Sequence, residues 1–238
     1  MYSERPSRLR GAVVWSQSEM PAAEARVLPD GCMDLLWWDG ALVVAGPDTR
    51  AHLFSRRAGT RMTGLRLPPG TGPLVFGVRA HELRDQRTPL EAVWPERAVR
   101  LLAEQIAEAP DPGRALESLA AGRLREGPSE GREVPEGRAL TGAVAELLGS
   151  GRAVAEVAAA VVLSERQLHR RCMDAFGYGP KTLARVLRLQ QALLSAADGS
   201  TLAEVASAAG YADQAHFSRE VRALAGVTAT ELLADRSA

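Results

Sequence analysis

Two short polar segments carry the side chains of this sequence whose types and spacing point most clearly to chemistry. The first holds two arginines and a histidine, and the second a glutamine, a histidine and an arginine: Arg166, His169 and Arg170, then Gln214, His216 and Arg219. An arginine can donate two hydrogen bonds to guanine, a glutamine can pair with adenine, and Ala215 can touch a thymine methyl group. These residue types could therefore recognise base edges in duplex DNA if both segments enter a groove.

Neighbouring residues favour contact with the DNA backbone. Arg171 is expected to neutralise a phosphate, and Lys181, the only lysine of the chain, extends the same basic surface. Ser164 stands where a helix should begin, so it is expected to cap that helix and leave backbone N–H groups that can meet a phosphate. Two alternatives stay open. The arginines of the first segment could neutralise only phosphate, and Arg219 could form a local ion pair with a neighbouring carboxylate.

The elements that must position these side chains form an internal repeat. The tetrapeptide Ala-Glu-Val-Ala occurs at 155–158 and again at 203–206, an offset of 48 residues, and each copy precedes one polar segment. Small alanine faces allow a second helix to cross closely, as in a helix-turn-helix. The pattern predicts helices at 154–161, 165–176, 202–209 and 214–224, with Ser164 and Asp213 as N-caps and a connecting helix through 183–197.

This region resembles the DNA-binding domain of the AraC/XylS family of transcriptional regulators. The resemblance covers residues 140–234 and is carried by Ser164, Leu168, Arg170, Gly177, Pro180, Arg188, Ala192, Gly210, Tyr211, Asp213, Phe217, Arg219 and Gly226. Cys172 and Val221 stand where the family usually has a large aromatic residue, and Ala229 where it usually has a proline. By the family pattern, the groove-facing residues are Arg166, His169, Arg170, Gln214, Ala215, His216 and Arg219.

The resemblance also implies partners. They are double-stranded promoter or operator DNA, RNA polymerase, a second copy of the chain in a homodimer, and a small-molecule effector. The two recognition helices are expected to enter successive major-groove segments about 34 Å apart on one face of the DNA. The function implied is that of a sequence-specific transcriptional regulator.

The overall charge does not by itself indicate a nucleic-acid partner. The chain has 29 Lys and Arg residues against 29 Asp and Glu residues, so the positive charge that meets phosphate must be local. Hydrophobic residues make up 46% and charged residues 24%, which is typical of a soluble globular protein. The apolar runs are too short for a membrane span and no signal segment follows Met1, so we expect a cytoplasmic protein with no membrane partner.

The N-terminal region carries short apolar runs interrupted by Gly and Pro, which is the pattern of strands. The expected strands are 9–15, 33–38, 41–44, 53–54, 62–67 and 74–78, with a tight hairpin at Asp39-Gly40. Regulators of the resembled family often place a cupin-like barrel here, and residues 28–34, 46–48 and 77–83 are similar to an N-terminal domain of some actinobacterial, hence bacterial, members. We therefore predict an α+β fold of two domains: a small cupin-like β-barrel with flanking helices, then an all-α domain.

Composition also divides the chain. Residues 126–137, rich in Gly, Pro and charge, are interpreted as a linker between an N-terminal regulatory domain, 1–125, and a C-terminal DNA-binding domain, 138–238. Two amphipathic helices are expected before the linker, one starting near Pro95 and one capped by Asp111. Their apolar stripes either mediate dimerisation or cover the barrel, because a stripe does not specify its partner.

Three residues are candidates for a ligand site in the N-terminal domain. Cys32 follows a Pro-Asp-Gly turn, and it is either a small buried hydrophobic residue or a thiol sensor activated by a nearby arginine. Trp37 and Trp38 must point to opposite faces of one strand, so one of them should face the interior. There it would pack in the core or stack on a planar ligand.

Catalysis and bound cofactors are not expected. A metal-dependent cupin needs about three histidines and a carboxylate, and the N-terminal region offers only His52 and His81. Phosphate-binding loops, nucleophile elbows and zinc-protease motifs do not occur in the sequence. We therefore expect no enzyme activity and no metal. Two other functions stay open: alkylation-damage repair through Cys32 with the same DNA-binding module, and a regulator without ligand whose barrel only dimerises.

Overall fold

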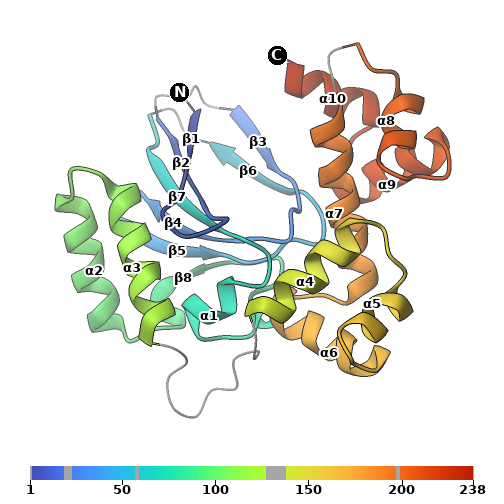
Figure 1. The fold of residues 1–238 in the computed structure, drawn as a ribbon. Helices are drawn as coiled ribbons and strands as arrows, with labels where there is room; N and C mark the ends of the chain where they lie inside the picture. The colour runs from blue at the N-terminus through green and yellow to red at the C-terminus, as the bar shows by residue number, and fades with distance from the viewer. Residues whose placement is uncertain (1, 19–22, 57–58, 127–137, 197–198, 238) are drawn as a thin grey trace.

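The computed structural model describes residues 2–18, 23–56, 59–126, 138–196 and 199–237. An N-terminal domain built on an antiparallel sheet is followed by a helical C-terminal domain (Figure 1). The predicted α+β fold of two domains is therefore confirmed. Of the expected linker, only Glu126 is among the described residues, where it ends helix α3 (Pro112–Glu126); residues 127–137 lie outside them.

Six strands form the main sheet in the order β1-β2-β7-β4-β5-β8, with every neighbouring pair antiparallel. Strands β3 and β6 pair separately as a two-stranded ribbon. The bounds are β1 Tyr2–Pro6, β2 Val13–Gln17, β3 Ala23–Val27, β4 Met33–Trp38, β5 Ala41–Ala45, β6 His52–Arg56, β7 Met62–Leu67 and β8 Arg87–Pro89. The predicted hairpin is present, since Asp39 and Gly40 join β4 to β5 and both have positive φ.

The sheet is not closed into a barrel, so the predicted cupin-like barrel is wrong. Strands β1 and β8 are its two edges, and the β3–β6 ribbon forms a second layer instead of completing a cylinder (Figure 1). The strand expected at 74–78 is also wrong, because these residues largely belong to helix α1 (Gly72–Phe76). A short buried apolar run fits a strand or a helix equally, and Pro73 in the first turn favours the helix.

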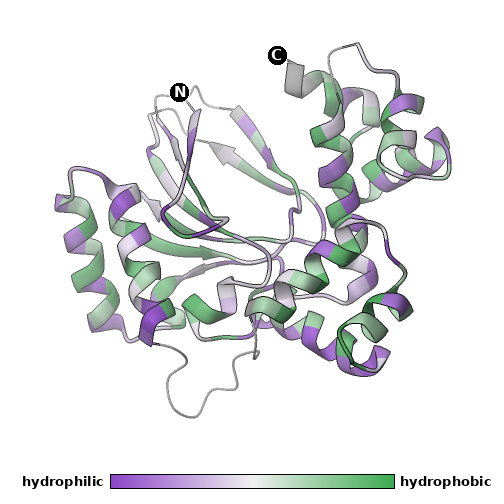
Figure 2. Ribbon diagram, in the orientation of Figure 1, coloured by the Kyte–Doolittle hydropathy of each residue, from purple (hydrophilic) through white to green (hydrophobic). Residues whose placement is uncertain are grey.

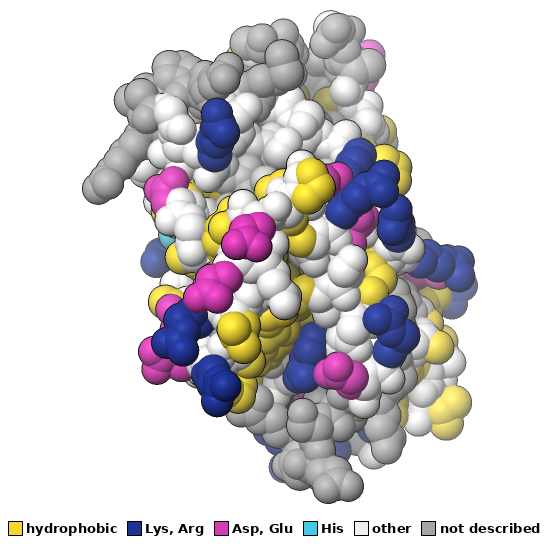
Figure 3. Space-filling model, turned by 90° about the vertical axis from the view of Figure 1, so that its left-hand side faces the viewer, with side chains coloured by type: hydrophobic (Ala, Val, Ile, Leu, Met, Phe, Trp, Pro, Cys, Tyr) yellow, Lys and Arg dark blue, Asp and Glu magenta, His cyan; other side chains and the backbone are white. Residues whose placement is uncertain are grey.

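Helices α2 (Glu96–Glu108) and α3 cover one face of the main sheet. The carboxylate of Asp111 accepts the backbone N–H of Arg114 at 3.0 Å, as expected of an N-cap. Val99 and Ile106 of α2 and Leu116 of α3 are buried in the core beneath the sheet. The apolar stripes thus cover the sheet, while the outward side, seen in Figure 3, carries interspersed basic and acidic side chains around smaller apolar areas. The 3₁₀ helices η1 (Ala80–Leu83) and η2 (Leu90–Ala92) complete this domain.

The C-terminal domain contains the predicted pairs of helices around one core (Figure 2). Its helices are α4 Arg138–Gly149, α5 Val154–Ala160, α6 Glu165–Phe176, α7 Pro180–Ser195, α8 Leu202–Ala208, α9 Gln214–Ala225 and α10 Ala229–Ser237. The three residues that depart from the family pattern, Cys172, Val221 and Ala229, are all buried in this core. Within the described part of the chain, no helix is long and apolar enough to cross a bilayer.

The turn inside each helix-turn-helix unit needs a residue in the left-handed backbone conformation. In the second unit it is Gly210, with φ of 71°, and 48 residues earlier it is Val162, with φ of 56°. A β-branched residue is strained at positive φ. The Val162 side chain is 90% exposed, so packing does not offset that strain.

We expect Val162→Gly to raise the free energy of unfolding by about 1 kcal/mol, because it removes the strain and gives up almost no buried surface. Val161→Gly is the matched control. Val161 has φ of −98° and is partly buried against the core, so its loss should destabilise the protein. Urea denaturation measures both variants, and a Val162→Gly protein less stable than the parent would contradict the strain.

Candidate functional site

Helix α6, the second helix of the first unit, begins at its predicted cap. The Ser164 hydroxyl accepts the backbone N–H of Gln167 at 3.3 Å, and the Gln167 side-chain oxygen accepts the backbone N–H of Ser164 at 2.8 Å. This capping box fixes the start of the helix. Leu168 and Cys172 are buried, as predicted. The exposed side of the helix carries Arg166, His169 and Arg170.

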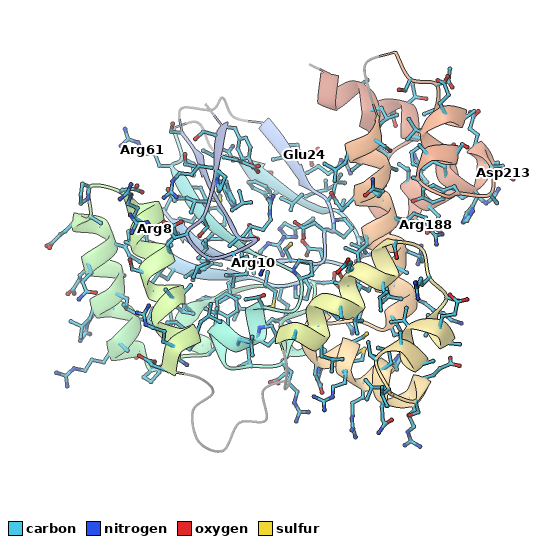
Figure 4. The ribbon with its side chains drawn as sticks, in the orientation of Figure 1. Arg8, Arg10, Glu24, Arg61, Arg188 and Asp213 are labelled. Carbon is cyan, nitrogen blue, oxygen red and sulfur yellow. The ribbon has the colours of Figure 1, made fainter. Side chains whose placement is uncertain are left out.

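Helix α9 repeats the arrangement in the second unit. The carboxylate of Asp213, labelled at the outer edge of this unit in Figure 4, accepts the backbone N–H of His216 at 2.6 Å. The predicted buried stripe is confirmed: Phe217, Val221 and Leu224. Gln214, Ala215 and Arg219 are exposed, and His216 is half-buried with its ring edge-on to Tyr211.

The two units are held together by α7. Its residues Leu183, Val186 and Leu189 are fully buried in the common core. Arg188, labelled between α7 and the second unit in Figure 4, places its guanidinium 5.6 Å from the centre of the Tyr211 ring. Lys181 is exposed and Arg171 is half-buried. The side chains predicted to meet DNA are thus accessible on one helical domain, and their contact with DNA stays a prediction.

The N-terminal domain contacts the C-terminal ends of both recognition helices. At α6, His81 of η1 lies 3.5 Å from the carboxylate of Asp174. At α9, the backbone N–H of Ala51 donates to the carbonyl of Leu224 at 2.6 Å, and the Arg26 guanidinium donates to the next carbonyl. The sheet domain is therefore docked directly on the elements that would face DNA.

A cavity of about 440 Å³ lies between the main sheet and the β3–β6 ribbon. Its floor comes from β2, β7 and β4, its roof from β3 and β6, and one wall from α7. Gln190 of α7 is part of this wall, and its amide donates to the carbonyl of Pro29 at 2.7 Å. A side chain of the helical domain thus helps to enclose a cavity of the sheet domain.

The cavity floor is laid out in cross-strand rows, because alternate residues of a strand share a face. Gln17, Met62 and Trp38 form one row, Trp15, Gly64 and Leu36 the next, and Arg66 with Asp34 the third. A Cβ atom on Gly64 would lie 2.2 Å from the Trp15 ring, so only glycine lets that indole lie across the sheet. The Trp15 indole N–H then donates to the carboxylate of Asp34 at 2.8 Å.

Three acidic side chains surround Arg66 of the third row. The Arg66 guanidinium lies 3.5 Å from Glu4, 3.3 Å from Asp30 and 3.7 Å from Asp34. The pKa of Asp34 is raised to about 6, because burial and the nearby charge of Asp30 together outweigh the opposing charge of Arg66. The single guanidinium of Arg66 therefore interacts with three carboxylates. In a separate ion pair, the Arg87 guanidinium donates two hydrogen bonds, of 2.9 and 2.6 Å, to the Asp48 carboxylate.

The candidate ligand residues fall on different sides of the sheet. Cys32 and Trp38 line the cavity, whereas Trp37 packs against the helix-covered core on the opposite face. Burial, together with the charges of Asp30 and Asp34, raises the pKa of the Cys32 thiol well above its usual range. The thiol is therefore protonated at neutral pH and poorly nucleophilic. In the part of the chain that the structure describes, no three His, Cys, Asp or Glu side chains are grouped to hold a metal ion.

Sequence reasoning missed the charged floor of the cavity. Asp34 follows Met33 and precedes two leucines, and Arg66 stands between Leu65 and Leu67, so each charge interrupts an apolar strand. A charge is rarely buried unless it is paired, and the two positions could have been proposed as partners on that ground.

Comparison with known proteins supports the two-domain reading. Residues 157–235 match the helix-turn-helix domain family, and residues 12–89 match a domain family of unknown function. No curated protein matches the sequence. Among solved structures, that of ToxT from Vibrio cholerae at 1.65 Å is 9% identical with a TM-score of 0.52, covering 98% of this chain and 97% of ToxT. A lysine-to-alanine variant of apo ToxT from Vibrio cholerae is 11% identical with a TM-score of 0.50, covering 96% of this chain and 98% of that one.

These likenesses show the fold over nearly the whole length of both chains. The helix-turn-helix match begins within α5 and extends through the second unit, and most of the residues that carry the sequence resemblance occupy the caps, turns and core of the two units. Ser164 and Asp213 cap the second helices, Gly177 and Gly226 end them, and Leu168 and Phe217 anchor them in the core. Residues 157–235 therefore belong to the helix-turn-helix domain family, and the whole chain has the two-domain fold of ToxT.

Proposed function

We propose that this chain is a transcription regulator of the AraC/XylS family, which binds promoter or operator DNA sequence-specifically and is controlled by a small effector in the cavity of its sheet domain. The observation that carries the proposal is the position of α7. This helix holds both helix-turn-helix units in one core, and its Gln190 forms part of the cavity wall. A group bound in the cavity therefore touches the element that sets the position of both recognition helices.

The base-reading roles follow from residue type and exposure. We assign Arg166 and Arg170 to guanine and Gln214 to adenine, with apolar contact from Ala215. The remaining candidates are assigned to supporting contacts with bases or phosphates: Ser164, His169, Arg171, Lys181, His216 and Arg219. In this proposal residues 1–125 are the regulatory part and 138–238 the DNA-binding part.

The effector would act through the β3 ribbon. An effector changes an equilibrium only if it binds the two states differently. The roof of the cavity carries Arg26, which bonds to the end of α9, and the loop after β3 carries Pro29, which bonds to α7. Filling the cavity would move this roof and so change the docking of the second unit. A homodimer and RNA polymerase belong to the proposal as partners at the promoter.

A solved structure with a similar fold supports the proposal of a small-molecule ligand. ToxT has been solved bound to (E)-4-(8-methylnaphthalen-1-yl)but-3-enoic acid, in a structure 10% identical to this chain with a TM-score of 0.51, covering 98% of both chains. The cavity described above has the size of ligand sites in proteins, which are about 300–1,000 Å³.

The repair alternative is less well supported. It requires a nucleophilic thiolate at Cys32, but two carboxylates and burial hold this thiol in its protonated form. Mass spectrometry after exposure to a methylating agent tests it, since repair predicts a methyl group on Cys32.

Fluorescence anisotropy with the duplex that flanks the chain's own gene tests the DNA-binding part. We expect tighter binding to this duplex than to a scrambled one, with affinity falling steeply as salt rises, because phosphate contacts release counterions. Sedimentation of the free and DNA-bound chain reports the stoichiometry at the same time. An absence of binding to any duplex at low salt would contradict the proposal.

A further inference from the structure

We propose that the cavity takes an amphipathic organic cation, an amine or guanidine carried on a flat apolar body with a hydrogen-bond acceptor at its far end. The inference rests on the proposed function, because it concerns the effector of that same cavity. It follows from how charge, aromatic rings and orphan donors are distributed along the cavity floor.

The row of Arg66 and Asp34 would hold the cationic group. Here Glu4, Asp30 and Asp34 all lie within 4 Å of the one guanidinium of Arg66. An added cation relieves the repulsion between these carboxylates, whereas a ligand carboxylate would add to it.

The other basic residues of the lining do not offset the acidic groups around Arg66. Arg87 donates two hydrogen bonds to the carboxylate of Asp48, and Arg26 donates to the carbonyl of Ala225 at the domain interface. Burial and the neighbouring charge of Arg87 lower the pKa of His52, so this ring is neutral at neutral pH. Among the described lining residues, Arg66 and Arg87 are paired with carboxylates, and Arg26 is held at the domain interface by the Ala225 carbonyl, away from the Arg66 and Asp34 end of the cavity.

The middle of the cavity suits a flat body. Trp15 lies across Gly64 in the floor, and Phe54 of the roof meets Trp38 edge-to-face with ring centres 6.5 Å apart. His52 stacks beside Phe54 at 6.4 Å. Aromatic faces attract both planar rings and cations, so this lining favours the same class of ligand.

The far end offers two donors. The indole N–H of Trp38 and the side-chain amide N–H group of Gln17 are buried and have no hydrogen-bond partner among the described residues. A buried donor left without an acceptor is unfavourable. Trp38 stands four residues along β4 from Asp34, roughly 13 Å at about 3.3 Å per residue. A ligand of about that length reaches both ends, and its oxygen would accept these two donors.

Calorimetric titration of the full chain with matched aryl-alkyl compounds tests the ligand class. The panel consists of tryptamine and phenethylamine, both compounds with a ring methoxy group, and the carboxylic acids with the same rings and chain lengths. We expect the amines to bind at least about tenfold more tightly than the acids, and the methoxy amines more tightly than the plain amines. Equal or tighter binding of the acids, or no binding by any amine, overturns the proposal.

Three variants test which residues bind the two ends of the ligand. Asp34→Asn keeps an acceptor for the Trp15 indole and should lower amine affinity about tenfold or more, because it removes a charged contact. Trp38→Phe should abolish the advantage of the methoxy compounds and leave the plain amines unchanged. Trp37→Phe is the matched control on the opposite face and should change neither. Loss of the amine preference in Trp37→Phe, or its retention in Asp34→Asn, contradicts the assignment.

Anisotropy with the same compounds separates this inference from the proposed function. If an acid binds more tightly and shifts DNA affinity, the cation class is wrong and effector control survives. If amines bind as expected but DNA affinity stays unchanged, the ligand class stands and control of DNA binding through the cavity fails.

Discussion

Replacing Arg170 by alanine is expected to lower affinity for the specific duplex about 10- to 100-fold and to leave affinity for a scrambled duplex nearly unchanged. The reason is that a bidentate arginine–guanine contact is worth about 1–3 kcal/mol of discrimination. Arg170 is exposed on α6, and the capping box at Ser164 fixes the helix that presents it. Anisotropy at constant salt measures both affinities.

Two controls separate base reading from charge. Arg97→Ala removes an exposed arginine from α2, on the sheet domain, and should change neither affinity. Lys181→Ala should weaken binding to both duplexes alike and reduce the salt dependence, as expected of a phosphate contact. If Arg170→Ala weakens both duplexes by the same factor, the residue contacts only phosphate.

Removing the carboxylate of Asp48 is expected to lower the free energy of unfolding by roughly 3–5 kcal/mol, because Asp48→Ala leaves a buried guanidinium without its charge partner. The side chains of Asp48 and Arg87 are only 8% and 17% exposed, and they are joined by two hydrogen bonds. Guanidinium chloride denaturation followed by circular dichroism measures the loss.

An exposed ion pair provides the comparison. Glu126 lies 3.2 Å from Arg123 but is 66% exposed, so Glu126→Ala should cost at most about 1 kcal/mol. A loss for Asp48→Ala as small as that of Glu126→Ala would mean that water replaces the missing carboxylate. It would also remove the reason for treating Arg87 as neutralised within the cavity.

The helical domain could be predicted from the sequence because its signals are local. Ser164 and Asp213 mark the start of a helix, the turn glycines mark its end, and Leu168 and Phe217 recur at helical spacing. The sheet domain was harder because its strands are short. Strands β1 and β8 are largely polar, and the apolar run that forms α1 has no period long enough to distinguish helix from strand. Closure of a barrel depends on which strands are edges, which composition does not encode.

The candidate ligand site could be predicted only in part, for a related reason. Trp37 and Trp38 follow from alternation along one strand, but which of them faces the cavity depends on where the helices α2 and α3 pack. The pairing of Asp34 with Arg66 depends on the register between β4 and β7, which are separated by more than twenty residues. Contacts set by register between distant strands are invisible to reasoning about single segments.

The 48-residue repeat has a consequence for the DNA rather than for the protein. A helix-turn-helix protein that carries one reader binds as a symmetric pair, so its operator is a palindrome. Here one chain carries two unlike helix-turn-helix units joined by α7, and the residues predicted to contact DNA are rich in arginine in the first unit and include Gln214 and Ala215 in the second. If both units contact bases, the two ends of the binding site differ in sequence, so the site has a direction. Inverting the site would turn the sheet domain toward the opposite end of the promoter. The orientation of the operator therefore determines which end of the promoter the sheet domain faces.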